Sequence, residues 1–211
     1  MITKITGILI RVKDEEVRLQ VGAFEYQVLV PEVVRRQLQA RTGSEITLHT
    51  IQYFEGSQMS NRMTPRLIGF LTEAEEDFFD LFCTVEKIGV KKALKALGRP
   101  VKEIASAIQR QDAKWLTTLP GIGKQTADQM IATLKTKVTK FAVMVDETAD
   151  PTLTGPQTAV DGQIIEDSYA MLMATGLSPV DSRLLLDKVF AMGEPITCVQ
   201  DVLSLAFKPK K

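Results

Sequence analysis

The residues best suited to chemistry lie in Leu116–Lys135, where Gly121-Ile122-Gly123 separates two short helical stretches. Glycine can adopt a positive φ and lets the backbone approach another surface closely. The amides of such a turn, and of the first turn of the following helix, lack internal partners, and the helix dipole adds positive charge. Together they form a seat for a phosphate group, with Lys124 and Lys135 supplying full charges nearby. The pattern is typical of a helix-hairpin-helix, which holds a nucleic-acid backbone without reading its bases.

This turn has two other interpretations. A Pro-Gly turn between helices can be a plain connection, and this stretch alone does not exclude it. A P-loop fits poorly, because Thr118 and Gln125 stand where that motif needs a glycine and a hydroxyl residue. We therefore reject nucleotide binding at this site.

The hairpin motif occurs a second time in the chain. Glu86–Leu97 reads EKIGVKKALKAL and Pro120–Ile131 reads PGIGKQTADQMI, at a constant offset of 34 residues. At that offset Ile88 matches Ile122 and Gly89 matches Gly123. Such an internal duplication predicts two hairpins that act in tandem on successive phosphates.

The first copy departs from the second at one position. Lys87 stands where the second copy has its first glycine, so we expect this turn to be less tight. Lys91 and Lys92 would then contribute charge in place of close backbone approach. The alternative for these lysines is a solvated face on an amphipathic helix.

Composition limits the function classes. The apolar fraction of 45% is ordinary for a soluble globular protein. No apolar run reaches the length of a bilayer span and no secretory signal precedes the first strand, which predicts a cytoplasmic protein without membrane contact. Cys83 and Cys198 are expected to be reduced core thiols. A single histidine, His49, and no clustered cysteines argue against a metal site.

The net charge of zero hides an asymmetry along the chain. Residues 1–70 carry 9 Lys and Arg against 7 Asp and Glu, residues 71–141 carry 12 against 9, and residues 142–211 carry 5 against 10. The hairpin region is therefore basic and the C-terminal region acidic, which predicts different partners for the two. Because the basic excess is modest, tight DNA binding requires several copies of the chain or backbone phosphate seats.

Periodicity divides the chain into four parts within an α+β multidomain class. Residues 1–70 hold five short alternating stretches and one helix at Pro31–Gln39, which predicts a small antiparallel barrel of the OB type. Residues 71–141 form an all-α tandem helix-hairpin-helix domain. Residues 142–162 lose periodicity and are expected to be a linker. Residues 163–211 form a three-helix module of the UBA type, suited to binding another protein. Glu55–Pro65 is expected to be a long polar loop.

This order of parts, over the whole length, resembles the RuvA family of bacterial Holliday-junction-binding proteins. The resemblance is carried by Leu119–Lys124 (LPGIGK) with Thr126-Ala127, and by Ile88-Gly89 with the lysines that follow. The start of the chain, with Gly7 in the first strand, and the Leu67–Phe70 end of the barrel are also similar. LPGIGK turns occur in many DNA-repair proteins, so it is the order of domains that is specific.

The resemblance implies a homotetramer, or an octamer of two such rings, that holds an unfolded four-way junction on its concave face for recombination and repair. It implies that the C-terminal module binds the motor RuvB, and that a RuvC-type resolvase is a further partner. ATP and Mg²⁺ would be used by the motor, with no cofactor and no catalytic residue in this chain. The DNA-binding residues that it implies are Ile88, Gly89, Lys91, Lys92, Gly121, Ile122, Gly123, Lys124 and Thr126.

The family also carries two adjacent acidic residues on a pin at the centre of the tetramer, which repel phosphates and help to part the strands. Here the matching segment is Tyr53-Phe54-Glu55-Gly56, in which only Glu55 is acidic. The loop that follows, Ser57–Pro65, is extended. This sequence therefore resembles a divergent member of the family.

Two other function classes remain open at this point. An enzyme of the glycosylase or nuclease kind would need a carboxylate beside the hairpin, and Asp128 is the candidate. A general repair scaffold without junction specificity would bind single strands on the barrel, where Tyr26, Tyr53 and Phe54 are the available stacking residues.

Overall fold

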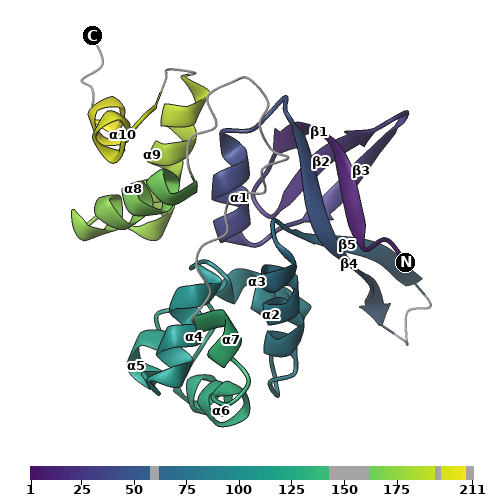
Figure 1. Cartoon of the computed structure of the whole chain (residues 1–211), viewed down its shortest axis with the longest axis vertical. Coiled ribbons are helices and arrows are strands. Elements are labelled where there is room, and N and C mark those ends of the chain that lie inside the picture. The colour runs from purple at the N-terminus through teal and green to yellow at the C-terminus, as the bar shows by residue number, and fades with distance from the viewer. Residues whose placement is uncertain (58–61, 143–161, 193–195, 208–211) are drawn as a thin grey trace.

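A computed structural model describes residues 1–57, 62–142, 162–192 and 196–207. Three parts are distinct in it: a β-barrel, a group of helices below the barrel in Figure 1, and a smaller helical module beside the helix of the barrel. Within the described ranges, no helix combines the length and the apolar character needed to cross a membrane. The observed elements bear out the α+β multidomain class.

Five strands close into a barrel in the order β1-β2-β3-β5-β4, as expected of an OB-type fold. Neighbouring strands are antiparallel except β3 and β5, which pair in parallel. The single helix α1 (Glu32–Gln39) lies between β3 and β4 in the chain. The strands are β1 (Lys4–Val12), β2 (Glu16–Val21), β3 (Phe24–Leu29), β4 (Glu45–Ser57) and β5 (Arg62–Phe70).

Alternation along the strands fills the barrel with aliphatic side chains, and α1 adds Val33, Val34 and Leu38 to the same buried cluster. At Gly7, an added Cβ would lie 2.5 Å from the carbonyl oxygen of Gln20 on the neighbouring strand. Only glycine fits at this close approach, which explains its place in the first strand.

The β4–β5 hairpin differs from the expectation of a long loop at Glu55–Pro65. Glu55 pairs with Thr64 and Gly56 with Met63, so the two strands continue as a ladder beyond the barrel. The loop prediction was wrong for these residues because Gly56 and Pro65 break the sequence pattern without breaking the pairing. The tip of the predicted extension, residues 58–61, lies outside the described residues.

The helical domain begins with α2 (Glu73–Cys83), whose N-terminus carries a capping box between Thr72 and Glu75. Phe78, Phe79 and Phe82 of this helix are buried in one cluster that also contains Phe70 of β5, so barrel and helices share a core. Both predicted hairpins follow. The remaining helices are α3 (Val90–Ala96), α4 (Val101–Gln109), α5 (Ala113–Leu116), α6 (Lys124–Leu134) and α7 (Thr139–Ala142).

The C-terminal module consists of α8 (Gly162–Ala174), α9 (Pro179–Ala191) and α10 (Val199–Ala206). Ser178 caps α9, accepting a hydrogen bond from the amide of Asp181. The buried apolar residues of the module form a cluster of their own. Most of the predicted linker, residues 143–161, lies outside the described residues.

Candidate nucleic-acid interface

The two hairpin turns have nearly the same backbone conformation. Gly121 has φ of 78° and Lys87, at the matching position, has φ of 67°. The residue two places later in each copy caps the next helix, with φ −92° and ψ 171° at Gly89, and φ −93° and ψ 173° at Gly123. The expectation that the first turn is less tight was therefore wrong. Lys87 adopts the left-handed conformation despite its side chain, which costs about 1 kcal/mol relative to glycine.

Each turn leaves a row of backbone amides without partners. The first amide to bond back into α6 is that of Ala127, to the carbonyl of Gly123, and the first in α3 is that of Ala93, to Gly89. No side chain caps either helix. An added Cβ on Gly89 or Gly123 would meet nothing within 4 Å, so both seats are open to a ligand. Four amide donors at the positive end of a helix dipole favour an anion such as a phosphate.

The two hairpins lie side by side through equivalent residues. The ammonium of Lys92 donates to the hydroxyl of Thr126 over 3.3 Å, and these two residues are separated by the 34-residue offset of the duplication. Gly121 also lies against Lys92, whose Cγ would be 3.7 Å from an added Cβ. A contact between equivalent positions is what an approximate two-fold axis between the repeats produces. The contact thus places the two hairpins next to each other.

The predicted site residues fall into two groups: isoleucines buried in the core and lysines near the seats. Ile88 and Ile122 are 4% and 5% exposed and join the shared core, so they anchor the turns and leave contact to the backbone. Lys124 is exposed beside the second seat, and Lys92 is engaged with Thr126 between the seats. This last contact was missed, although the repeat offset already aligned Lys92 with Thr126.

Glu55, the candidate pin residue, is bound by two cations. The ammonium of Lys91 on α3 lies 2.5 Å from one carboxylate oxygen, and Arg66 donates to the other over 2.9 Å. The hydrogen bond from Lys91 and then that from Arg66 hold the pKa of Glu55 below its ordinary value. The barrel hairpin is therefore tied to the first hairpin helix, and one predicted DNA-binding lysine is occupied by an internal carboxylate.

Comparison with known proteins finds a matching family model for each of the two parts that form this site. Residues 1–60 match the model of the RuvA N terminal domain, and residues 79–136 match the model of the SAM-like helix-hairpin-helix tandem. The second match covers both seats described above.

Curated relatives match over the full length. The chain is 44% identical over 213 residues to a Holliday junction branch migration complex subunit RuvA of Rhodopirellula baltica, with 100% of each chain covered. It is 34% identical over 210 residues to the subunit of the same name from Desulfosudis oleivorans, covering 99% of this chain and 98% of the relative. A RuvA of Salinibacter ruber is 27% identical over 209 residues, covering 99% and 98%. With relatives of this identity matched over its full length, and with its barrel matching the RuvA N terminal domain, the chain belongs to the RuvA family.

Proposed function

We propose that this chain is the Holliday-junction-binding subunit of a branch migration complex, acting in DNA recombination and repair. The observation that carries the proposal is the pair of equivalent phosphate seats, open to solvent and joined through Lys92 and Thr126. The seats offer backbone amides, which contact any phosphate whatever the base. Sequence neutrality is what a migrating junction requires, since it passes through every sequence.

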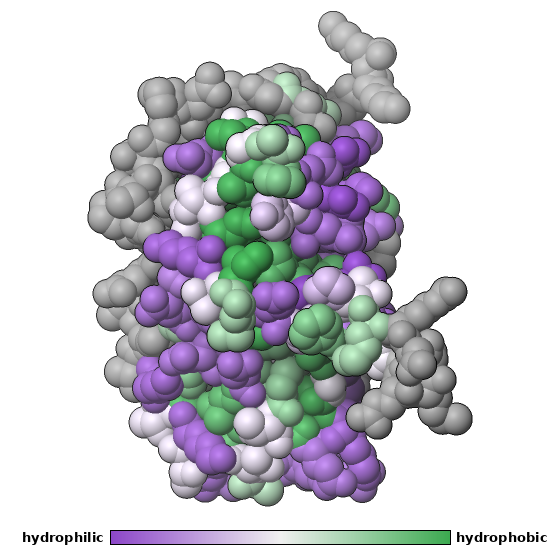
Figure 2. Space-filling view, turned by 90° about the vertical axis from the view of Figure 1, so that its right-hand side faces the viewer, coloured by the Kyte–Doolittle hydropathy of each residue, from purple (hydrophilic) through white to green (hydrophobic). Residues whose placement is uncertain are grey.

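Tight binding follows from assembly of several chains. Net charge supplies little attraction, but four copies on one scaffold act on one junction at high effective concentration. A homotetramer, with octamers as stacked pairs, is supported by apolar side chains exposed on the barrel, where Ile8 and Ile10 of β1 and Phe24 of β3 face solvent. Figure 2 shows hydrophobic residues continuing along the face that lies on the right in Figure 1. An uncovered apolar face of this kind is typical of a subunit interface.

The role proposed for Glu55 follows from its ion pairs. The carboxylate holds Lys91 beside the first seat, and a phosphate arriving there competes for the same ammonium. Once Lys91 has transferred to the phosphate, Glu55 keeps only its pairing with Arg66 and lies as a less neutralised negative charge near the first seat. This single residue would repel strands at the junction centre less than two adjacent carboxylates do.

The C-terminal module is proposed to recruit the motor RuvB. Leu177, Leu184 and Leu185 line a shallow groove between the turn before α9 and α9 itself, and Leu184 is 60% exposed. Exposed apolar side chains on a small helical module favour a protein partner. ATP and Mg²⁺ would be used by that motor, and a RuvC-type resolvase would meet the complex on the junction.

A gel-shift series at one salt concentration tests the proposal. Four-way junction DNA should bind at least about tenfold more tightly than duplex or single strand of equal length, because only the junction fills the seats of all four subunits. Equal affinity for the three substrates would contradict junction specificity and favour the general repair scaffold.

A further inference from the structure

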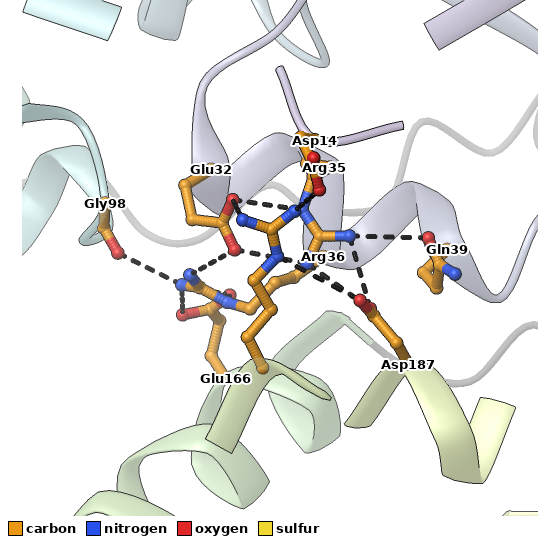
Figure 3. Close-up of polar contacts among 9 residues, drawn as sticks. Asp14, Glu32, Arg35, Arg36, Gln39, Gly98, Glu166 and Asp187 are labelled. Atoms are coloured by element: carbon orange, nitrogen blue, oxygen red, sulfur yellow. Dashed lines mark hydrogen bonds and ion pairs between the residues drawn. The ribbon is translucent and has the colours of Figure 1, made fainter. Parts of the chain in front are cut away.

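Two adjacent arginines on α1 are the largest fully buried side chains in the described part of the chain. Arg35 is 2% exposed and Arg36 is 1% exposed, while the apolar residues of the same helix fill the barrel core. Their guanidinium groups point away from the barrel and toward α8 and α9 of the C-terminal module (Figure 3). Buried arginine is rare without partners, so these partners define the contact between the two domains.

Arg35 is bound by one carboxylate from its own helix and one from the module. It donates to Glu32 over 3.0 Å and to Asp187 of α9 over 3.2 Å. Burial by itself lowers the pKa of Arg35, but Glu32 and Asp187 together raise it above its ordinary value. The module therefore supplies a charge that this arginine needs when it is buried.

Arg36 contacts all three parts of the protein. It donates to both carboxylate oxygens of Glu166 on α8, over 2.8 and 3.0 Å, and its guanidinium lies 4.1 Å from the ring centre of Tyr169. It also donates to the carbonyl of Gly98, in the turn after the first hairpin helix, over 3.1 Å. Figure 3 shows Arg36 between Glu166 and Gly98. One side chain of the barrel thus joins the hairpin domain to the module.

In a third ion pair, the module supplies the arginine and the barrel supplies the carboxylate. Arg183 of α9 donates to Asp14, in the turn between β1 and β2, over 2.5 Å, and lies 3.7 Å from Glu32. In the described residues, the buried apolar cluster of the module shares no member with that of the barrel. The contact between these two domains is therefore made mainly by charge.

Contacts of this kind are close to energetic balance. Burial raises the pKa of Glu166 above its ordinary value, against the lowering effect of Arg36. One nitrogen of Arg36, Nη1, has no hydrogen-bond partner. A buried ion pair gains little once its desolvation is counted, but removing one partner leaves an uncompensated buried charge. Both a docked and a released module are thus accessible to one chain.

We propose that Arg35 and Arg36 form a latch, which holds the C-terminal module against the barrel by charge and releases it reversibly. In the latched state Met171 and Leu184 remain exposed, so the module presents its apolar side chains from a fixed position. In the released state the module is held only by the chain that joins it to α7. The latch concerns the position of the module and does not depend on the proposed DNA or motor binding.

Pulsed EPR distances in the full-length protein test the latch. Spin labels are placed at exposed Lys4 of β1 and exposed Ser204 of α10, each replaced by cysteine, in a chain whose Cys83 and Cys198 are serine. Labelled chains are mixed with an excess of unlabelled chains, so that only distances within one chain are measured. Raising the salt from about 0.1 M to about 1 M, where the Debye length falls from about 10 to about 3 Å, should shift the population from a short, narrow distance to long, broad ones.

The variant Glu166→Gln with Asp187→Asn should show the long distances already at low salt, with a docked fraction at least about tenfold below that of the parent. Asp128→Asn, an exposed carboxylate on α6 away from the module, is the matched control and should behave as the parent does. Arg36→Gln on the barrel side should release the module in the same way, with the helical content unchanged by circular dichroism. A short distance that persists in both latch variants, or release only by the module-side variant, would overturn the proposal.

Discussion

Replacing Gly123 by valine should weaken phosphate binding while leaving the stability of the fold nearly unchanged. Gly123 has an ordinary extended backbone, and a Cβ there meets nothing within 4 Å in the chain. The folded protein therefore does not need glycine at this position. Gly121 is different, because its φ of 78° strains any other residue whatever the space around it.

The expected change in stability is much smaller than the expected change in DNA binding, so the two can be measured separately. Replacing glycine at the helix cap lowers the free energy of unfolding by several tenths of a kcal/mol. Valine also reduces the conformational entropy of the unfolded chain, which raises the free energy of unfolding by about 0.4–1 kcal/mol. The net change in stability should therefore be less than about 0.5 kcal/mol. In the complex, the valine side chain occupies the place of the phosphate. Losing two charge-assisted hydrogen bonds of about 1.5–3 kcal/mol each weakens one seat by about 100-fold or more.

Fluorescence anisotropy with a labelled four-way junction, together with thermal unfolding, measures both quantities. Thr117→Val, an exposed change before the turn that removes only a local hydrogen bond to the carbonyl of Lys114, is the control and should leave junction binding unchanged. Gly89→Val should reproduce the loss at the first seat. Unaltered junction binding by Gly123→Val, with an unaltered melting temperature, would refute the assignment of this turn as a phosphate seat.

Three further predictions follow from other contacts. Lys87→Gly should raise the unfolding free energy by up to about 1 kcal/mol in chemical denaturation, because it relieves the left-handed strain of the first turn, and a loss of stability would contradict that strain. Glu55→Gln should tighten junction binding because it releases Lys91, and the gain should vanish in a Lys91→Met background; an equal gain in both backgrounds would show direct repulsion by Glu55 instead. Hydrogen bonds from Thr197 and Cys198 hold the pKa of Asp201 at about 2, below its ordinary value of 3.8. Its stabilisation of α10 should be complete above about pH 4 and lost as the pH falls toward 2, and hydrogen exchange of α10 should show no such step in Asp201→Asn.

Local patterns in the sequence predicted most of the elements correctly. The alternation of β1 and β2 depends on neighbours within a few residues, and the structure confirms it. The capping box at Thr72 and the serine cap at Ser178 are local in the same sense. The hairpin repeat was readable because both copies keep an isoleucine and a glycine at one offset.

The features that the sequence did not reveal depend on contacts between residues far apart in the chain or on backbone conformation. The left-handed conformation of Lys87 is imposed by the turn around it, against the preference of the residue. The pairing of Arg36 with Glu166 joins residues 130 positions apart, and no local pattern indicates which of many carboxylates it meets. The acidic character of the C-terminal region was interpreted as a sign of an external partner. Part of that charge instead faces arginines of the same chain.

The contact between Lys92 and Thr126 has a consequence for directionality. The two backbones of a DNA duplex run in opposite directions, and a rotation by half a turn about an axis through the groove exchanges them. Two seats related by the same kind of rotation would offer the same backbone geometry to a duplex turned end for end. The side chains differ between the seats, since Lys91 lies beside the first and Lys124 beside the second, so the main-chain contacts alone would be independent of the direction in which an arm moves.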